Sequence, residues 1–310
     1  MNQVVECVMN VSEGRRPEVI AKIAEAIARV PESYLLHQTS DFDHNRSVFT
    51  FAGRPSAVEQ AAWKAILSAV SVIDIQQHLG VHPRVGAVDV VPFVPLRGIE
   101  IEDCVQIARR LGKRVGEELE IPVYLYEKAA FPGRKSNLAE IRRGQIEGLR
   151  KRMVLDPESR PDYGPAQLHP TAGATVIGAR DFLIAFNVYL RSSDVTLAKE
   201  IARRIRERDG GLAGVKALGL FIERRNQAQV SINITNPRLA SLAQVFDRVQ
   251  SEACRLGTQP AGSEIIGLIP RFAVPADVDR LLLEDAIENH ILESILERAM
   301  AASQPGADAL

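Results

Sequence analysis

Short apolar runs and longer amphipathic segments alternate along the first 94 residues. Runs rich in β-branched and aromatic residues are typical of strands, and apolar residues spaced three and four apart are typical of helices. Proline favours the first turn of a helix, so Pro17 and Pro55 indicate two helix starts. The predicted order is strand, helix, strand, strand, helix, strand, and Pro92 is expected to interrupt the last strand. The four strands are expected at 3–9, 33–38, 46–52 and 85–94.

The same order of elements recurs after residue 180. A helix at 101–119 and a strand at 122–126 are expected to complete the first half. The connection at 153–180 is predicted to be irregular because proline and glycine are frequent there. Near the end, 278–302 is expected to form one or two leucine-rich helices, and 303–310 a disordered tail. The elements of the second half are expected at 182–190, 194–208, 218–223, 229–235, 237–256 and 263–269.

This repeated order predicts an α/β (α+β) fold with two split-βαβ-like subdomains, at 1–180 and 181–302. Each would form a mixed sheet that carries helices on one face and needs a cover on the other. If the two sheets pack face to face with the helices outside, each covers the other. The space between them would then be the natural place for a ligand.

The composition narrows the class of protein. With 46% hydrophobic and 25% charged residues, the chain reads as a soluble globular protein. Its 38 basic and 39 acidic residues lack the basic excess that is typical of nucleic-acid binding. No apolar run approaches the roughly 18–20 residues that span a membrane, and the N-terminus does not look like a secretory signal. We therefore expect a cytoplasmic protein with no nucleic-acid or membrane partner.

The three cysteines, Cys7, Cys104 and Cys254, are far apart and odd in number. That pattern favours neither a disulfide framework nor a cysteine zinc site. All three are expected to be buried free thiols.

Two polar clusters stand next to predicted regular elements, DFDHNR at 41–46 and HLGVHPRVGAVDVVPF at 78–93. Loops held by a rigid scaffold often carry function, so these are the candidate sites. His78 and His82 are four apart, which on a helix would place both on one face and suit a metal. The glycine between them and the proline after them disfavour such a helix, so no metal is expected.

Each of these residues also has a purely structural interpretation. His78 would cap a helix end, where a cation suits the helix dipole, and His82 would fill a turn. Asp41 would bond to its own backbone in a turn. Arg46 would be a surface strand residue and Asp89 an outward strand position. The residues alone leave both interpretations open.

Other chemistry has little support in the sequence. No phosphate loop, dinucleotide fingerprint or GxSxG nucleophile elbow occurs. Basic residues are frequent between 134 and 152. They favour a solvated helix face, with attraction of an anionic ligand tail as the alternative.

Seven segments spread over about 3–270 carry a family resemblance. They are VVECVMNVSEGRRPEVI, HLGVHPRVGAVDVVPFVPLRG, VYLYEKAA, PDYGP, GARDFLIAFNVYL, AQVSINI and GSEIIGLIP. On these segments the chain resembles glutamate formiminotransferase, the transferase part of formimidoyltransferase-cyclodeaminase. It ends without the cyclodeaminase domain that long members carry.

The resemblance implies a fold, an assembly and a site. It implies two α/β subdomains whose sheets face each other across a folate-holding tunnel, in a homodimer. The catalytic histidine of the family is the second one in HxxxHPR, which here is His82. The folate segment of the family falls here on Gly164, Pro165, Ala166, Gln167, Leu168, His169, Pro170, Thr171, Ala172 and Gly173.

The implied reaction moves a formimino group from formiminoglutamate to tetrahydrofolate, which acts as co-substrate. A nitrogen of tetrahydrofolate attacks the formimino carbon and loses a proton, and the departing glutamate nitrogen gains one. A histidine titrates near neutrality, so His82 can take the first proton and supply the second. Arg46 and Arg84 are candidates for the substrate carboxylates, because a guanidinium matches a carboxylate bidentately.

Asp41, Asn45 and His78 are the candidates to orient His82 or the formimino nitrogen. One departure from the family bears on them. Acidic residues follow the double leucine of the second strand in the family, whereas here no acid follows it before Asp41. If an acid partners the catalytic histidine, Asp41 must take that role.

Three functions remain open from the sequence. The first is formimino transfer, and the second is formyl transfer between 5-formyltetrahydrofolate and glutamate by the same residues. The third is a non-catalytic folate-binding protein, which the presence of both His82 and the 164–173 segment disfavours. An RNA-binding module on split βαβ sheets is weaker still, because an aromatic RNA-binding run on a middle strand is missing.

Overall fold

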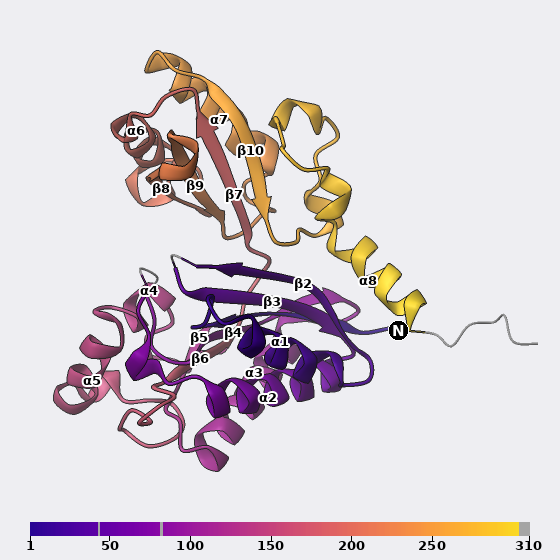
Figure 1. Ribbon diagram of the computed structural model, residues 1–310, viewed down its shortest axis with the longest axis vertical. Helices are drawn as coiled ribbons and strands as arrows, with labels where there is room; N and C mark the ends of the chain where they lie inside the picture. The colour runs from indigo at the N-terminus through magenta and orange to yellow at the C-terminus, as the bar shows by residue number, and fades with distance from the viewer. Residues whose placement is uncertain (43, 81–82, 304–310) are drawn as a thin grey trace, which may run out of the picture. The chain divides into compact units, whose positions relative to one another are not determined.

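The computed structural model describes residues 1–42, 44–80 and 83–303, and the chain divides into two compact units after Arg180 (Figure 1). His82 and the tail beyond residue 303, both subjects of predictions, lie outside the described residues. None of the described helices is both long and apolar enough to cross a membrane.

The first unit is built on a six-stranded mixed sheet with strand order β2-β3-β1-β4-β6-β5. β1 pairs antiparallel with β3 and β4, β2 pairs antiparallel with β3, and β4 and β5 pair parallel with β6. The strands are β1 (Val4–Val11), β2 (Ser33–Asp41), β3 (Arg46–Gly53), β4 (Val88–Arg97), β5 (Val123–Glu127) and β6 (Thr175–Ala179).

Helices cover the two faces of this sheet unequally. α1, α2 and α3 lie along one face, where they bury Met9, Phe49, Phe51 and Phe93 in the main core (Figure 1). α4 and α5 pack a smaller apolar cluster against alternate residues of β4, β5 and β6, on the opposite face. The helices are α1 (Pro17–Ala28), α2 (Pro55–Val72), α3 (Ile101–Glu118), α4 (Leu138–Ile141) and α5 (Gln145–Leu155), with 3₁₀ turns at Ile75–Gln77 and Pro157–Ser159.

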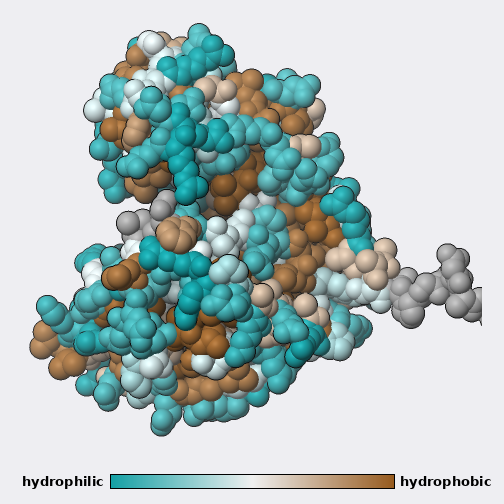
Figure 2. Space-filling model, in the orientation of Figure 1, coloured by the Kyte–Doolittle hydropathy of each residue, from teal (hydrophilic) through white to brown (hydrophobic). Residues whose placement is uncertain are grey.

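The second unit has a four-stranded antiparallel sheet in the order β10-β7-β9-β8. Apolar residues of α6 and α7 pack with Phe186, Val230 and Ile232 on one face. The elements are β7 (Ile184–Leu190), α6 (Val195–Ile205), β8 (Val215–Ile222), β9 (Gln227–Ile234), α7 (Leu242–Arg255), β10 (Pro260–Ile266) and α8 (Leu292–Ala302). Hydrophilic residues make up most of the visible face of each unit, with hydrophobic residues in separate areas (Figure 2).

Both predicted element orders are confirmed, as is the mixed α/β class with two sheets. The expected interruption at Pro92 is wrong, since β4 continues to Arg97. Val91 and Phe93 on either side of Pro92 stay paired with β6. The missing N–H of the proline removes one possible hydrogen bond and does not end the strand.

Three further expectations need correction. The irregular 153–180 connection contains a strand, β6, in the middle of the first sheet. The predicted helix at 278–302 begins instead with 3₁₀ turns at Asp279–Leu281 and Ile287–Asn289. Between them the backbone pairs with β10: Ser263 N donates to Leu282 O, and Glu284 N donates to Ser263 O. Only Leu292–Ala302 is α-helical. Cys254 is exposed, whereas the other two thiols are buried as predicted.

Candidate active site

Three segments of the first unit meet around the side chain of Asn45. Its Oδ1 accepts a hydrogen bond from Gly14 N at 2.8 Å, and its Nδ2 donates to Leu79 O at 3.1 Å. The carbonyl oxygen of Asn45 lies 2.8 Å from His78 Nε2. The end of β1, the β2–β3 turn and the loop that precedes β4 are therefore tied together by one buried asparagine.

The backbones approach so closely here that side chains would not fit. A Cβ on Gly14 would lie 2.3 Å from Asp41 O, and one on Gly80 would lie 2.4 Å from His44 O. Asn45 itself has φ +48°, a left-handed conformation that asparagine adopts more readily than most residues. The local sequence, with its glycines and asparagine, suits this junction.

His78 is buried and is held by the junction. Because a carbonyl oxygen can only accept, the contact with Asn45 O places the proton on Nε2 and leaves Nδ1 as an acceptor in the neutral ring. Burial lowers the pKa of His78, and the nearby Arg84 adds to that effect. Nδ1 is buried and has no hydrogen-bond partner among the described residues. The ring is thus a neutral, oriented acceptor.

Asp41 lies at the end of β2 and is about half exposed. Its Oδ1 accepts from His44 N at 2.7 Å and lies 2.9 Å from His44 Nδ1. The structural interpretation of Asp41, an aspartate that closes its own turn, describes these contacts. His44 is therefore the histidine that the described contacts place beside Asp41.

Asp89 is buried, so the expected outward strand position is wrong. Its Oδ1 accepts from Val85 N at 2.8 Å, and its Oδ2 forms an ion pair with Arg142 at the end of α4. Burial raises the pKa of Asp89, while Arg142 acts in the opposite direction. The carboxylate fixes the loop that leads into β4 and ties it to α4.

Arg84 belongs to the same network. Its Nη1 donates to Gln145 Oε1 at 2.6 Å, and its Nη2 lies 3.3 Å from Glu147 Oε1 and 3.4 Å from His78 O. Gln145 has φ +57°, a strained conformation for a residue with a side chain. The start of α5 therefore holds the guanidinium of Arg84 against the loop that carries His78.

Positive charge collects around Asp89. Arg46 is half-buried, and this burial lowers its pKa, as does the neighbouring Arg142; Asp41 and Asp89 oppose the shift. The Nε atoms of Arg84 and Arg142 are buried without an acceptor among the residues that the structure describes. Arg46 and Arg142 thus act on Asp89, whereas Arg84 forms an ion pair with Glu147. The unused Nε donors of Arg84 and Arg142 are the groups of this cluster that suit an anionic ligand.

The segment from Gly164 to Gly173 lies partly beside this site. Thr171 O accepts from Ile75 N at 2.8 Å, and Ala172 O accepts from Ala87 N at 2.9 Å. The 171–172 carbonyls thus hold the 3₁₀ turn before His78 and the residue that leads into β4. By contrast, a Cβ on Gly164 would meet Ile121 O at 2.6 Å, so that end packs at the start of β5.

Fewer backbone groups of this segment are free to bind a ligand than its proline and glycine content suggested. His169 and Gly173 pair through both backbone groups, and His169 Nδ1 accepts from Thr171 N and Ala172 N at 3.4 and 3.0 Å. Pro165, Ala166 and Gln167 are exposed. The exposed half is free to meet a ligand, and the other half braces the 78–86 loop.

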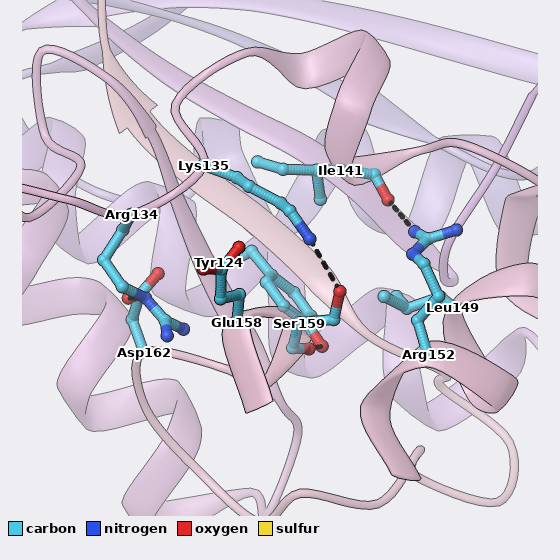
Figure 3. A pocket seen from close by; sticks show the side chains of 9 residues that line it. All are labelled: Tyr124, Arg134, Lys135, Ile141, Leu149, Arg152, Glu158, Ser159 and Asp162. Carbon is cyan, nitrogen blue, oxygen red and sulfur yellow. Dashed lines mark hydrogen bonds and ion pairs between the residues drawn. The ribbon is translucent and has the colours of Figure 1, made fainter. Parts of the chain in front are cut away.

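A small cavity beside α5 is lined by apolar, acidic and basic side chains, among them Arg134, Lys135 and Arg152 (Figure 3). Lys135 Nζ donates to Ser159 Oγ at 2.9 Å, Arg134 Nε lies 3.0 Å from Asp162 Oδ1, and Arg152 Nη2 donates to Ile141 O at 2.8 Å. The volume is about 10 Å³, room for about one water molecule. These three cations are half-buried and hydrogen-bonded, so they brace α5. Arg143, Arg150 and Lys151 are exposed, as expected of a solvated face.

Two family models match the two units. Residues 4–180 match the model described as formiminotransferase domain, N-terminal subdomain, and residues 185–286 match the model described as formiminotransferase domain. The chain belongs to the formiminotransferase family. The family resemblance that the sequence motifs indicated is thereby confirmed.

Individual relatives of the family match along most of the chain. It is 46% identical to a glutamate formimidoyltransferase of Thermoplasma acidophilum over 300 residues, which cover 96% of this chain and 98% of the relative. A glutamate formimidoyltransferase of Streptococcus pyogenes is 41% identical, with 94% and 100% covered. The mouse formimidoyltransferase-cyclodeaminase is 42% identical over 88% of this chain, which spans 51% of that relative.

Sequence reasoning missed two features of this site, the pairing of Arg142 with Asp89 and the contact of Arg84 with the first turn of α5. One signal was present: Asp89 stands in the apolar run VGAVDVVPF, and a carboxylate in a buried strand needs a partner. Which arginine supplies that partner, 53 positions further on, was not visible from the sequence.

Proposed function

We propose that this chain transfers the formimino group of N-formimino-L-glutamate to tetrahydrofolate, giving 5-formiminotetrahydrofolate and L-glutamate. The observation that carries the proposal is the similarity to glutamate formimidoyltransferases over nearly the whole chain, across both units. Tetrahydrofolate would be a co-substrate. A homodimer in the cytoplasm belongs to the proposal, and analytical ultracentrifugation would test the dimer.

His82 is proposed as the acid/base residue. It takes the proton from the attacking nitrogen of tetrahydrofolate and gives one to the departing glutamate nitrogen, so the reaction is proton-neutral overall. A side chain in this role contributes about 10²–10⁴-fold to the rate. Its neighbours support the role: Gly80 lies against the β2–β3 turn, and Arg84 is held by Gln145.

His78 is proposed as a positioning residue. With Nε2 committed to Asn45 O, its Nδ1 is an acceptor that can take a hydrogen bond from an N–H of the formimino group or from His82. The lowered pKa keeps that nitrogen unprotonated near neutrality. Asp41, beside Arg46 and His44, would hold the β2–β3 turn in place.

The carboxylates of the substrates are proposed to bind at the arginine cluster. Arg46 is the stronger candidate, because burial strengthens its attraction for an anion. Arg84 has both terminal nitrogens engaged, one of them in an ion pair with Glu147, so it is the weaker candidate. The exposed half of the 164–173 segment would contact the folate.

A two-arm assay of the purified protein tests the function. In one arm the protein is incubated with tetrahydrofolate and formiminoglutamate, and formation of 5-formiminotetrahydrofolate is followed by mass. In the other it receives 5-formyltetrahydrofolate and glutamate. Turnover in the first arm at a rate well above the second is expected. Product in the second arm alone would favour formyl transfer, and binding of folate without product in either arm would favour the non-catalytic function.

A further inference from the structure

The sheet of the second unit carries a polar cluster on the face opposite its helices. Alternate residues of β7 point to opposite faces, and Phe186 and Val188 lie in the core with α6 and α7. Asn187 and Tyr189 therefore lie on the other face. The strand register sets Asn187 opposite Glu264 of β10 and Tyr189 opposite Gln229 of β9.

All three neighbours donate to the same oxygen of Glu264. Asn187 Nδ2 lies 2.9 Å from Oε1, the Tyr189 hydroxyl 2.7 Å and Gln229 Nε2 3.4 Å. The other oxygen, Oε2, receives no hydrogen bond from any residue in 1–42, 44–80 or 83–303. The carboxylate is thus fixed in place through one oxygen and open at the other.

The charge of Glu264 is not neutralised by a direct ion pair within the described residues. Arg225 interacts with Glu264 at longer range, but it makes two 2.6 Å contacts with Glu284 and lies over the ring of Tyr189, 4.1 Å from its centroid. A neutral amide in place of the Glu264 carboxylate would accept the same three hydrogen bonds, so the fold does not require the negative charge of Glu264. A charged acceptor held in place with one free oxygen suits recognition of an N–H donor.

Tyr189 keeps this arrangement intact over the working pH range. Burial and the hydrogen bond to Glu264 raise the pKa of its hydroxyl well above the ordinary value. The group therefore remains a donor, and the orientation of the carboxylate does not depend on pH near neutrality.

We propose that Glu264 binds a substrate through its free Oε2 and that the ligand presents an amidine-type edge, a carbon that carries N–H donors on either side. The inference rests on the proposed function, which supplies two such edges. One is the 2-amino and N3–H edge of the pterin ring. The other is the formimino group of formiminoglutamate. Asn187, Tyr189 and Gln229 act as positioning residues.

The test is Glu264→Gln, with Glu223→Gln as matched control at an exposed glutamate near the end of β8. Calorimetry measures binding of 5-formyltetrahydrofolate, which carries only the pterin edge, and of formiminoglutamate, which carries only the formimino edge. Loss of a charge-assisted hydrogen bond should weaken one of them by about 10- to 100-fold in the Glu264 variant alone. The arm that weakens identifies the ligand. Binding of both compounds within twofold of wild type would overturn the proposal.

A second ligand distinguishes lost recognition from poor folding of the Glu264 variant. A folate analogue with a methyl group in place of the 2-amino group should bind wild-type protein about 10- to 100-fold more weakly than the parent if the pterin arm is the responsive one. It should then lose no further affinity in Glu264→Gln. The proposal would be overturned if the losses of affinity from the analogue and from the Glu264 variant add together. It would also be overturned if a lower melting temperature of the variant accounts for weaker binding in both arms. Absence of turnover by the wild-type protein would count against the proposed function instead.

Discussion

The two units share an order of elements but carry their polar groups differently. In the first, Asn45, His78 and Arg84 lie on loops, which Asn45 ties together. Asp41, Arg46 and Asp89 stand at or next to the ends of the adjoining strands. In the second, Asn187, Tyr189 and Glu264 lie on the strands themselves. Loops can place several groups around one reacting atom, whereas a strand face offers a rigid surface that suits recognition. The contrast suggests chemistry in the first unit and ligand recognition in the second.

Replacing His82 should produce the largest effect on chemistry. We expect His82→Ala to lower turnover by about 10²–10⁴-fold, because a proton shuttle acts on the transition state more than on the bound substrate. His78→Ala should cost less, since it perturbs position and leaves the proton path. Turnover of both variants at saturating substrates is the measurement. Greater damage from His78→Ala would transfer the shuttle role to His78.

Breaking the buried ion pair of the first unit should strongly destabilise it. Asp89→Ala leaves Arg142 and Val85 N without their partner, at an expected cost of about 3–5 kcal/mol in the free energy of unfolding. The double variant Asp89→Ala, Arg142→Ala should recover part of that loss, because no buried charge is left unpaired. Urea unfolding compares the three proteins. A single variant as stable as wild type would show that the pair does not hold the loop.

Asn45 should be intermediate in its effect on stability. Both Asn45→Gly and Asn45→Ala lose the hydrogen bonds to Gly14 N and Leu79 O, which should cost about 1–3 kcal/mol. Alanine should cost about 1 kcal/mol more than glycine, because φ is +48° there and glycine adopts that conformation freely. Equal stabilities of the two variants would contradict the left-handed conformation.

The smallest effect concerns pH. The pKa of His78 is lowered in the folded state, so folding favours the neutral ring. The contribution of His78 is complete above its unfolded pKa, near 6.5, and is lost as pH falls through the folded value. Wild type should therefore lose more stability than His78→Gln between pH 7.5 and 5.5. Parallel urea midpoints for the two proteins over this range would refute the assignment.

The sequence was sufficient where the signal is local. The repeated element order follows from short apolar runs and helix-starting prolines, and each of the DFDHNR and HLGVHPR clusters is a short continuous run of the chain. β6 was hidden because TVIGA is short, follows a segment rich in proline and glycine, and pairs with parallel strands far away in sequence. The Arg142–Asp89 pair and the Glu264 cluster join residues from separate elements, so only the strand register and helix packing bring them together.

The division of roles between the two units can be tested most directly by steady-state kinetics of His82→Ala and Glu264→Gln, measured side by side with tetrahydrofolate and formiminoglutamate. We expect His82→Ala to lower kcat by about 10²–10⁴-fold while substrate affinity stays within a few fold. Glu264→Gln should raise KM for one substrate by about 10- to 100-fold and leave kcat within a few fold. A normal kcat for His82→Ala, or a loss in Glu264→Gln that falls on kcat alone, would contradict this account.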